Sequence, residues 1–261
     1  GGGNCSLYRS DEFDQMYEEQ ASTMDPDERQ EIVFDIQEML MEKQVVTPVM
    51  VQNRKMPYNT SLVQSPTTMP EYGLGSVYNF LSMEPTSNND SNSLDFAVSE
   101  DLTTLNPLNP ERGRAERMIN RIVYDRIMRI SPEEIEPQPW MAESIGRPNE
   151  TTRVVNLREG LQWHDGESLT AEDVKFTFEY GAEVSPNVAG IAEPIESIEV
   201  EDDLTAVFNL KNPVASFETV TLAGRSAQII PQHIWENVPD EVDAESATQW
   251  TNPEPVGSGP L

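Results

Sequence analysis

The sequence predicts an α/β fold of the mixed α+β kind, in which mixed sheets are flanked by helices. Residues 157–180 carry the signals of a strand, a tight turn and a helix, one after the other. Residues 195–200 and 206–210 alternate apolar and polar positions around Asp202-Asp203, which is the pattern of a β-hairpin. Helical segments elsewhere supply the flanking helices. At 261 residues, the chain could form one large domain or two small ones.

The strand, turn and helix of this central stretch follow from local rules. Asp165-Gly166 predicts a tight turn, because Gly tolerates positive φ and Asp hydrogen-bonds its own backbone. Thr170 is the expected N-cap of the helix, and the acidic first turn that follows suits the helix dipole. Val174 and Phe178 are spaced to share one apolar face.

The first 47 residues predict two helices. Ser10 caps a segment over residues 11–23. Asp25 is the expected N-cap of the second helix, with Pro26 at N1 and Glu28 completing a capping box. The expected buried face of the second helix consists of Ile32, Ile36, Met39 and Leu40.

The signals after these helices are weaker. Residues 45–51 form an apolar run that predicts an edge strand, or a strand that starts at Pro48. Residues 53–72 are rich in Pro, Thr, Ser and Asn and predict a loop. Residues 72–83 alternate small and aromatic side chains, which favours one more strand.

A second series of predicted elements follows a polar segment. Residues 84–93 contain only polar side chains apart from Pro85, which indicates a linker. Residues 94–98 alternate like a half-buried strand, and a helix is expected over residues 114–129. Further short elements are expected as a strand partner at 151–158, a helix at 212–222, a strand end at 229–231 and a short helix at 233–235.

The composition is strongly acidic. The formal net charge is −29, and Asp and Glu total 46 residues. This charge excludes nucleic acid and anionic membrane surfaces as direct partners. Lys occurs only four times, and an acid-rich, Lys-poor surface is expected of a protein kept soluble in high salt. The sequence therefore indicates a halophilic source, with an ordinary acidic secreted protein as the alternative.

Few residues are available for metal or redox chemistry. Cys5 is the single cysteine, so no disulfide framework and no thiolate cluster is expected. His164 and His233 are the two histidines, which leaves little for an imidazole metal site. No apolar run of about 18 residues predicts a membrane span. No apolar segment precedes Cys5 as it would in a signal peptide, and no cofactor is expected.

A resemblance to a known family rests on the central stretch. Its fixed spacing is similar to the most recognisable segment of the family 5 extracellular solute-binding proteins, the oligopeptide, dipeptide and nickel binders of ABC importers. The matched positions are Leu157, Arg158, Gly160, Trp163, His164, Asp165, Gly166, Leu169, Thr170, Ala171, Asp173 and Val174. Shorter similarities occur at Asn106-Pro107, at residues 137–144 and at the Gly257-Ser258-Gly259-Pro260 motif.

The order of the family-like segments differs from that of a family member. Residues 1–83 resemble the C-terminal end of such a protein, residues 84–93 are the linker, and residues 94–261 resemble its N-terminal lobe, a periplasmic-binding-protein-like lobe with an incomplete second lobe. Two explanations remain open. The chain could cross the junction of two tandem copies, which we favour, or it could be a permuted or deleted relative. The two pieces could still pair into one sheet.

The resemblance implies a substrate-binding component of an ABC transporter that captures peptides or similar small solutes outside the cell. The implied partners are the solute and ABC permease subunits, without direct membrane insertion of this chain. The implied location is the cell surface, with a lipid anchor in the full-length protein. The alternative is a non-binding structural or interaction fragment.

The resemblance also implies ligand contacts. In peptide-binding relatives, the loop after the Leu-x-Pro motif meets the ligand backbone. The corresponding positions here are Asn109, Pro110, Glu111, Arg112 and Gly113. An acid at Glu111 could pair with a peptide's amino end, or it could simply be an acid near a helix start. Gly257 and Ser258 are further candidates, at a hinge or beside a ligand.

Enzymatic chemistry has little support in the sequence. His164-Asp165 is adjacent along the chain, which does not position the two side chains for proton relay. Ser258 lacks the spacing and the strand–turn–helix context of a nucleophile elbow. The acidic clusters Glu133-Glu134 and 201–203 lack calcium-loop spacing, so solvated faces are expected.

Overall fold

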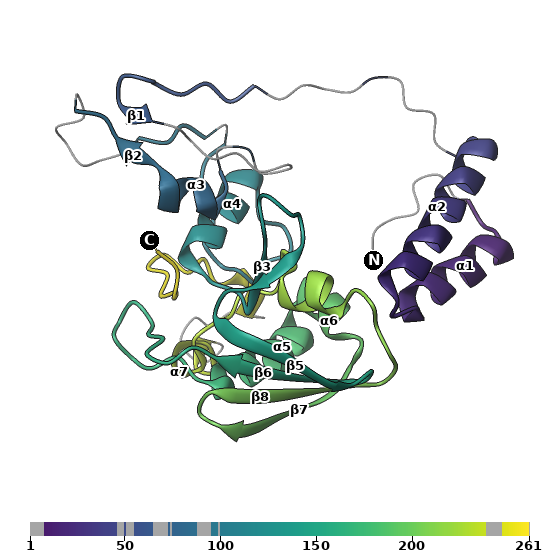
Figure 1. Cartoon of the computed structure of the whole chain (residues 1–261). Helices are drawn as coiled ribbons and strands as arrows, with labels where there is room; N and C mark the ends of the chain where they lie inside the picture. The colour runs from purple at the N-terminus through teal and green to yellow at the C-terminus, as the bar shows by residue number, and fades with distance from the viewer. Residues whose placement is uncertain are drawn as a thin grey trace.

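The computed structural model describes residues 8–45, 50, 55–64, 73, 75–87, 95–98, 100–238 and 247–260. Cys5, Pro48, Leu94, most of the expected strand at 45–51 and most of the expected linker lie outside the described residues. Figure 1 shows a sheet with helices packed on it, and a separate helical hairpin at one side. Within the described residues, no helix is long and apolar enough to cross a membrane.

A four-stranded antiparallel sheet forms the centre of the structure. Its strand order is β5-β6-β8-β7. The expected hairpin is confirmed, because β7 and β8 pair directly and the Asp202 carboxylate accepts the Leu204 amide in the turn between them (2.9 Å). The strands run over Ala142–Asn149 (β5), Thr152–Leu157 (β6), Ile195–Asp202 (β7) and Thr205–Leu210 (β8).

Strand β7 forms one edge of this sheet. Its acidic side chains Glu196, Glu199, Glu201 and Asp202 are all exposed, whereas Ile198 is buried. Glu199 and Glu201 point to the face opposite Ile198, because successive side chains of a strand alternate between the two faces. Glu196 and Asp202 lie at the register shifts near the two ends of the strand. The edge therefore presents carboxylates to solvent.

Helix α5 (Ala171–Val184) forms where the sequence predicts it, and it packs against β7 and β8. The Asp173 carboxylate accepts the amide of the N-cap residue Thr170 (2.9 Å). Val174 and Phe178 are buried on one face, so the expected apolar face is confirmed. Phe178 meets Phe208 of β8 edge to face at 5.4 Å, and the main core continues from these rings.

A second core lies beside α5 and helix α6 (Pro186–Ala192). Its largest rings are Tyr124 and Trp235, the latter on helix α7 (Gln232–Trp235). Trp235 packs edge to face on Trp250 at 5.0 Å. Residues 247–260 are thereby held against the start of the lobe, together with a 3-10 turn at Ala247–Gln249.

The helix expected over residues 114–129 is shorter than predicted. Helix α4 (Arg114–Val123) ends where Tyr124 becomes extended. Met128–Ile130 instead forms strand β3, which pairs with β4 (Pro137–Pro139). The apolar side chains after Val123 are buried from an extended backbone, which helical spacing alone could not distinguish from a longer helix.

Other expectations between residues 94 and 235 were partly wrong. Residues 95–98 form no strand, and Phe96 and Val98 are partly exposed. The expected helix at 212–222 is reduced to a π-helical turn at Phe217–Leu222, and residues 229–231 are not a strand. Phe217, Leu222, Ile229 and Ile230 are nevertheless buried in the core, whereas Phe96 and Val98 are exposed.

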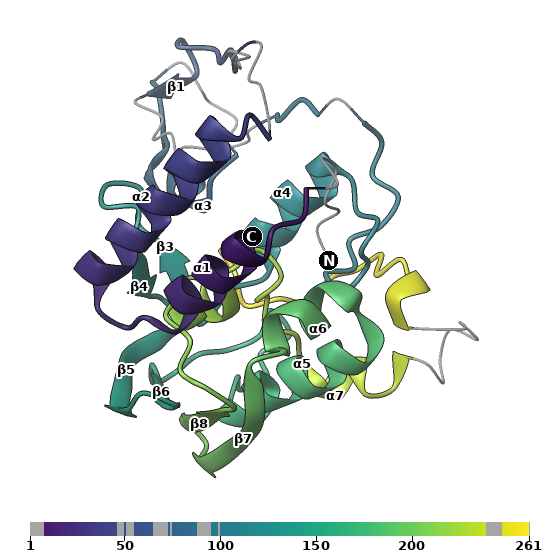
Figure 2. The same cartoon turned by 90° about the vertical axis from the view of Figure 1, so that its right-hand side faces the viewer.

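The first third of the chain contains helices α1 (Asp11–Ser22) and α2 (Pro26–Glu42), capped by Ser10 and Asp25 as expected. The prediction of a buried face on α2 was wrong. Ile32, Ile36, Met39 and Leu40 are only half-buried. Helix α1 packs against α2 and covers this face in part. Figure 2 shows this hairpin turned toward the viewer, in front of the remaining structure.

The next segment also differs from expectation. Residues 77–82 form helix α3 (Val77–Ser82) and not a strand, because the Ser76 hydroxyl accepts the Asn79 amide and caps a helical turn (3.2 Å). The expected linker begins with strand β2 (Glu84–Pro85), which pairs with β1 (Val63–Gln64) inside the expected loop. Each of these strands is only two residues long.

Among the described residues, the contacts between the first third and the rest of the chain include a backbone hydrogen bond and a pair of aromatic rings. Ala215 donates its amide to the Ala21 carbonyl at the end of α1 (3.0 Å). Tyr78 of α3 lies edge to face on Trp140, with ring centres 5.8 Å apart. Among the described residues, no strand of the first third joins the central sheet. The expected strand at 45–51 lies mostly outside those residues, so the pairing of the two pieces into one sheet stays a prediction.

A buried ion pair joins the sheet to the π-helical turn. The Arg153 guanidinium of β6 is fully buried and donates to the Glu218 carboxylate at 2.6 Å. Arg153 also donates to three backbone carbonyls, those of Asn149, Glu150 and Thr152. The same carboxylate accepts from the exposed Arg147 at 2.8 Å. Glu218 therefore neutralises a charge that has no access to water.

A second carboxylate organises the start of α4. Glu116 accepts the amides of Thr103, Thr104 and Gly113 at 2.6–2.9 Å, and also the Thr103 hydroxyl. Burial favours the neutral acid, but these hydrogen bonds to the charged form outweigh it and lower the pKa of Glu116 from 4.5 to about 2. The 100–105 segment is thus attached to the helix start.

Glu218→Gln is expected to destabilise the protein by about 3–5 kcal/mol, because it leaves the buried Arg153 without a charged partner. The free energy of unfolding measured in urea tests this. Lys211→Met is the matched control, since its pair with Glu193 is exposed and contributes at most about 1 kcal/mol. Equal effects of the two changes would contradict the structural role of Glu218.

Glu116→Gln is expected to destabilise the protein by about 1–3 kcal/mol near neutral pH, because the donors around it lose a charged acceptor. The folded pKa is lowered, so the stabilisation is present above pH 4.5 and is lost as the pH falls toward about 2. The stability difference between wild type and variant should therefore shrink over this window in urea titrations. Glu143→Gln, at an exposed position, should show no such trend. A pH-independent difference would show that the Glu116 charge is not what matters.

Candidate ligand-binding site

The loop over residues 109–113 leads into α4. Asn109 Oδ1 accepts the Glu111 amide at 2.7 Å, which closes a tight turn. Pro110 and Glu111 are exposed at the tip of this turn, and Asn109 is half-buried. The Glu111 carboxylate is therefore accessible to a solute from outside.

Arg112 points the other way, into the protein. It is 5% exposed, and its Nη1 donates to Gln228 Oε1 at 3.3 Å. With the Asn120 amide oriented to match its neighbours, Asn120 Oδ1 also accepts from Arg112 Nη1 at 3.1 Å. Burial lowers the pKa of Arg112 to about 10. The structure thus places Arg112 as an internal support of the loop.

Gly113 is the N-cap residue of α4, and its amide donates a hydrogen bond to the Glu116 carboxylate. A Cβ at this position would come within 2.8 Å of Glu100 Oε1, a carboxylate oxygen that accepts the Ala115 amide at 2.7 Å. Glycine therefore allows two carboxylates to reach the first turn of the helix. The loop conformation depends on these contacts.

Gly257 and Gly259 lie at the opposite end of α4. A Cβ on Gly257 would fall 1.9 Å from the Val123 carbonyl oxygen, and one on Gly259 would fall 1.9 Å from that of Ile122. Gly259 donates its amide to Val123 at 2.8 Å. The close backbone approach that glycine permits is thus made to a helix end within the protein.

His164 joins this glycine segment to the central turn. Its backbone amide donates to the Gly257 carbonyl at 2.9 Å, and Gly257 donates back to His164 Nδ1 at 3.2 Å. Nδ1 is therefore an acceptor, so Nε2 carries the proton and donates to the Gly259 carbonyl at 2.9 Å. These hydrogen bonds of His164 thus hold the backbone of Gly257 and Gly259 in place.

Two buried donors lie in the joined segments. Trp163 is 2% exposed, and within the described residues its Nε1 has no hydrogen-bond partner. Within the described residues, the Ser258 hydroxyl also has no hydrogen-bond partner. This hydroxyl is buried, although the residue as a whole is half-exposed. No imidazole or carboxylate in the described part of the chain activates Ser258.

The two groups of candidate residues do not converge. Gly113 precedes the first residue of α4, whereas Gly257 touches Val123, its last residue. A helix of 10 residues is roughly 15 Å long. The loop at 109–113 and the Gly257-Ser258 segment are thus separated by the length of α4.

The sequence did not predict the contact between Asp165 and His233. His233 Nε2 and Asp165 Oδ2 are 2.9 Å apart, and they join the central turn to α7. The hydrogen bond to His233 lowers the pKa of Asp165. The two residues are 68 positions apart, so no local pattern could reveal the pair. Asp165, which follows His164 in the sequence, thus forms its side-chain contact with His233.

The acidic clusters are exposed at Glu133-Glu134 and at residues 201–203, as expected. Within the described ranges, no group of three or more His, Cys, Asp or Glu side chains could hold a metal ion. The candidate positions therefore offer one exposed carboxylate, a buried arginine and a tightly packed glycine motif.

Comparison with known proteins shows which proteins the lobe is similar to. Residues 136–260 match the family model described as bacterial extracellular solute-binding proteins, family 5 Middle. The "Probable peptide-binding protein YejA" of Agrobacterium fabrum is 31% identical over 171 residues, which are 64% of this chain and 27% of that protein. The "Oligopeptide-binding protein AppA" of Bacillus subtilis is 36% identical over 111 residues, 41% of this chain and 19% of that protein.

A solved structure agrees with these matches. The crystal structure of the ABC transporter substrate-binding protein CtaP from Listeria monocytogenes aligns with a TM-score of 0.52 and 31% identity, over 62% of this chain and 32% of that one. The predicted mixed α/β fold is confirmed. The matched region is 27% or less of the two curated relatives. Residues 136–260 are therefore similar to the bacterial extracellular solute-binding proteins of family 5.

Proposed function

We propose that this chain supplies one lobe of the substrate-binding component of an ABC importer, and that it captures peptides or similar small solutes outside the cell. The observation that carries this proposal is the family 5 match along the folded segment 136–260. The similarity to the peptide-binding proteins YejA and AppA supports a peptide as the solute. Such a component binds and releases its solute without covalent chemistry, so we propose that the chain is not an enzyme.

The wider setting is part of the same proposal. A second lobe would close over the solute by hinge motion, and the closed form would dock on permease subunits. We place the protein at the cell surface, lipid-anchored in its full-length form, in a halophilic source whose salt screens the charge of −29. We propose that residues 1–83 and 94–261 derive from the end of one copy and the start of another, joined by residues 84–93.

The proposed solute contacts lie on the 109–113 loop. Glu111 is exposed beside a backbone turn, and a carboxylate there can pair with the ammonium group of a peptide. Arg112 contributes by holding the loop from inside, and Gly113 by ending it at the helix start. Gly257 and Ser258 are proposed as a second contact region, at a hinge or beside the solute.

One observation favours the alternative, a structural or interaction fragment that binds no solute. The two candidate regions stand at opposite ends of α4, and Gly257 is packed against the helix backbone. A solute site made from both would need groups from a second lobe. The proposals are distinguished by binding measurements on this chain.

The first measurement is thermal unfolding in about 2 M KCl with and without a mixture of di- to hexapeptides. A peptide present at about 100 times its dissociation constant stabilises the fold by about 2.7 kcal/mol, which corresponds to a midpoint increase of about 5–10 °C. A cooperative transition with no increase would favour the structural fragment. The absence of a cooperative transition would contradict one folded lobe.

Glu111→Gln is expected to weaken the binding of a stabilising peptide by up to about fivefold, because an exposed ion pair contributes at most about 1 kcal/mol. Calorimetric titration should show this loss for the free peptide and no loss for its N-acetylated form. Glu133→Gln, at another exposed acid, is the control. Equal loss with both peptide forms would rule out pairing with the amino end.

A further inference from the structure

The turn between β5 and β6 has the sequence Asn149-Glu150-Thr151, an Asn-x-Thr triplet without proline. Strand β5 ends at Asn149, which pairs with Thr152 of β6, so the triplet crosses the tip of a hairpin. Asn149 and Glu150 are exposed, and Thr151 is half-buried. Asn-x-Ser/Thr is the acceptor sequence for N-linked glycans on surface loops of exported proteins. The position of this triplet therefore provides the access that such an acceptor requires.

The Asn149 carboxamide is held by the hydroxyl residue of the triplet. Its Oδ1 accepts the Thr151 amide at 2.9 Å and the Thr151 hydroxyl at 3.2 Å. These two donors stabilise the negative charge that develops on Oδ1 when the carboxamide nitrogen gives up a proton. Both hydrogen bonds are made to the oxygen, so the nitrogen of this exposed side chain is the atom that can bond to a sugar.

The backbone of this hairpin is held by contacts that do not involve Asn149 Nδ2. The Asn149 carbonyl accepts from Arg153 Nη1 at 3.3 Å. The Thr151 carbonyl accepts the Leu210 amide of β8 at 2.8 Å. A sugar on Nδ2 would extend from an exposed side chain and leave these main-chain contacts intact. The folded hairpin can therefore carry a bulky group at this position.

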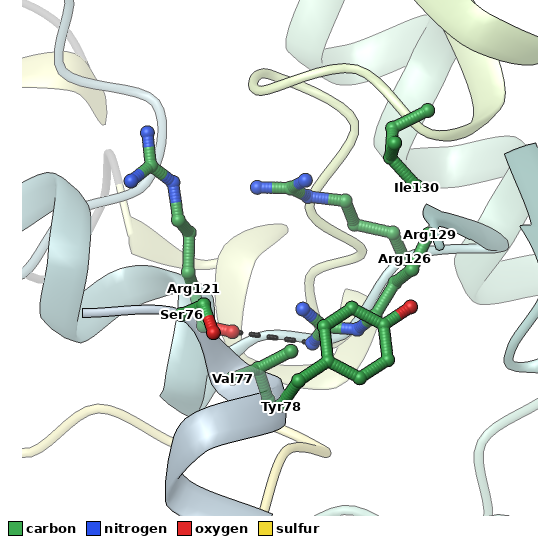
Figure 3. A pocket seen from close by; sticks show the side chains of 7 residues that line it. All are labelled: Ser76, Val77, Tyr78, Arg121, Arg126, Arg129 and Ile130. Carbon is green, nitrogen blue, oxygen red and sulfur yellow. Dashed lines mark hydrogen bonds between the residues drawn. The ribbon is translucent and has the colours of Figure 1, made fainter. Parts of the chain in front are cut away.

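A second triplet, Asn59-Thr60-Ser61, repeats this geometry in the first third of the chain. Asn59 Oδ1 accepts the Ser61 amide at 3.0 Å and the Ser61 hydroxyl at 2.7 Å, and all three residues are exposed. Helix α3 follows this turn in the chain, and its first residues line a small cavity together with three arginines of the lobe (Figure 3). Two exposed turns of this molecule thus present the same acceptor arrangement.

We propose that Asn149 carries an N-linked glycan and that Asn59 is a second acceptor. This modification rests on the proposed function, because N-linked glycans are added to chains that are exported. A glycan is bulky and solubilising. At Asn149 it would cover the tip of the β5–β6 hairpin and keep other proteins away from that end of the central sheet.

The reaction is a glycosyl transfer. The donor class is an oligosaccharide joined through its anomeric carbon to a lipid phosphate or diphosphate, and the catalyst is a transferase of the exporting cell. Asn149 Nδ2 forms a bond to the anomeric carbon, while the bond from that carbon to the phosphate oxygen breaks. The lipid phosphate leaves with the electron pair, and the amide nitrogen releases one proton. No oxidant or reductant takes part.

Peptide mass spectrometry of the protein isolated from the surface of its source cells tests the proposal. Trypsin cuts after Arg129 and Arg153 but not within Arg147-Pro148, so Asn149 is the single asparagine of the peptide 130–153. This peptide is expected to carry added mass in whole sugar residues, and fragmentation should locate that mass on Asn149. Recovery of the unmodified peptide alone would overturn the proposal.

Variants of the triplet assign the modification to its hydroxyl and its carboxamide. Thr151→Val should remove the added mass completely, whereas Thr151→Ser keeps a hydroxyl and should keep the mass. Thr152→Val, at the next threonine but outside the triplet, is the matched control and should be modified like the wild type. Asn149→Gln, at an exposed position, replaces Thr151→Val if that variant does not fold. Sugar retained at this turn in either variant would overturn the assignment.

Peptide binding measured on the same preparation separates the glycan from the solute-binding role. A protein that is glycosylated at Asn149 and binds no peptide supports the glycan and contradicts only the solute-binding role. A surface protein that binds peptides with Asn149 unmodified overturns the glycan and leaves the solute-binding role standing.

Discussion

The fixing of helix α4 at both of its ends is the constraint on which the rest of the lobe depends. At its start, the Glu116 carboxylate gathers the amides of Thr103, Thr104 and Gly113. At its end, the Val123 carbonyl accepts the Gly259 amide. Residues far apart in the sequence therefore meet at one short helix, and the candidate solute loop and the glycine motif are each attached to it.

The charged residues are divided between inside and outside. The acidic side chains of β7 and of the 133–134 turn face solvent, whereas four arginines are 5% exposed or less. Arginine suits such positions because its planar group donates several hydrogen bonds at once and stays charged when buried. The buried arginines are Arg112, Arg126, Arg129 and Arg153. Several of the few positive charges of this acidic chain thus lie in its interior, where they donate hydrogen bonds to neighbouring segments.

The sequence predicted those elements whose signals are local. The turn at Asp165-Gly166, the cap of α5 and the β7–β8 hairpin each depend on residues within a few positions, and all three are present. Predictions failed where contacts between residues far apart in the sequence determine the local structure. Residues 77–82 are a helix although their composition favours a strand. The end of α4 was misplaced because buried apolar residues follow it in an extended segment.

The candidate site was predictable only in part. The exposure of Glu111 follows from its place in a polar turn beside Pro110. The inward direction of Arg112 depends on Gln228, more than 100 residues away, and the Asp165–His233 contact depends on α7. Such pairs arise from the tertiary fold, so a single sequence carries no trace of them.

The exposed edge of β7 determines how the sheet can meet another protein. A strand of a neighbouring molecule that approached this edge would bring its own backbone carbonyls beside Glu199 and Glu201, and it would have to strip water from their carboxylates. Sheet extension on this side is therefore unfavourable even when salt weakens repulsion at a distance. A crowded population of such molecules can stay dispersed, and the surfaces left for specific association are those away from β7.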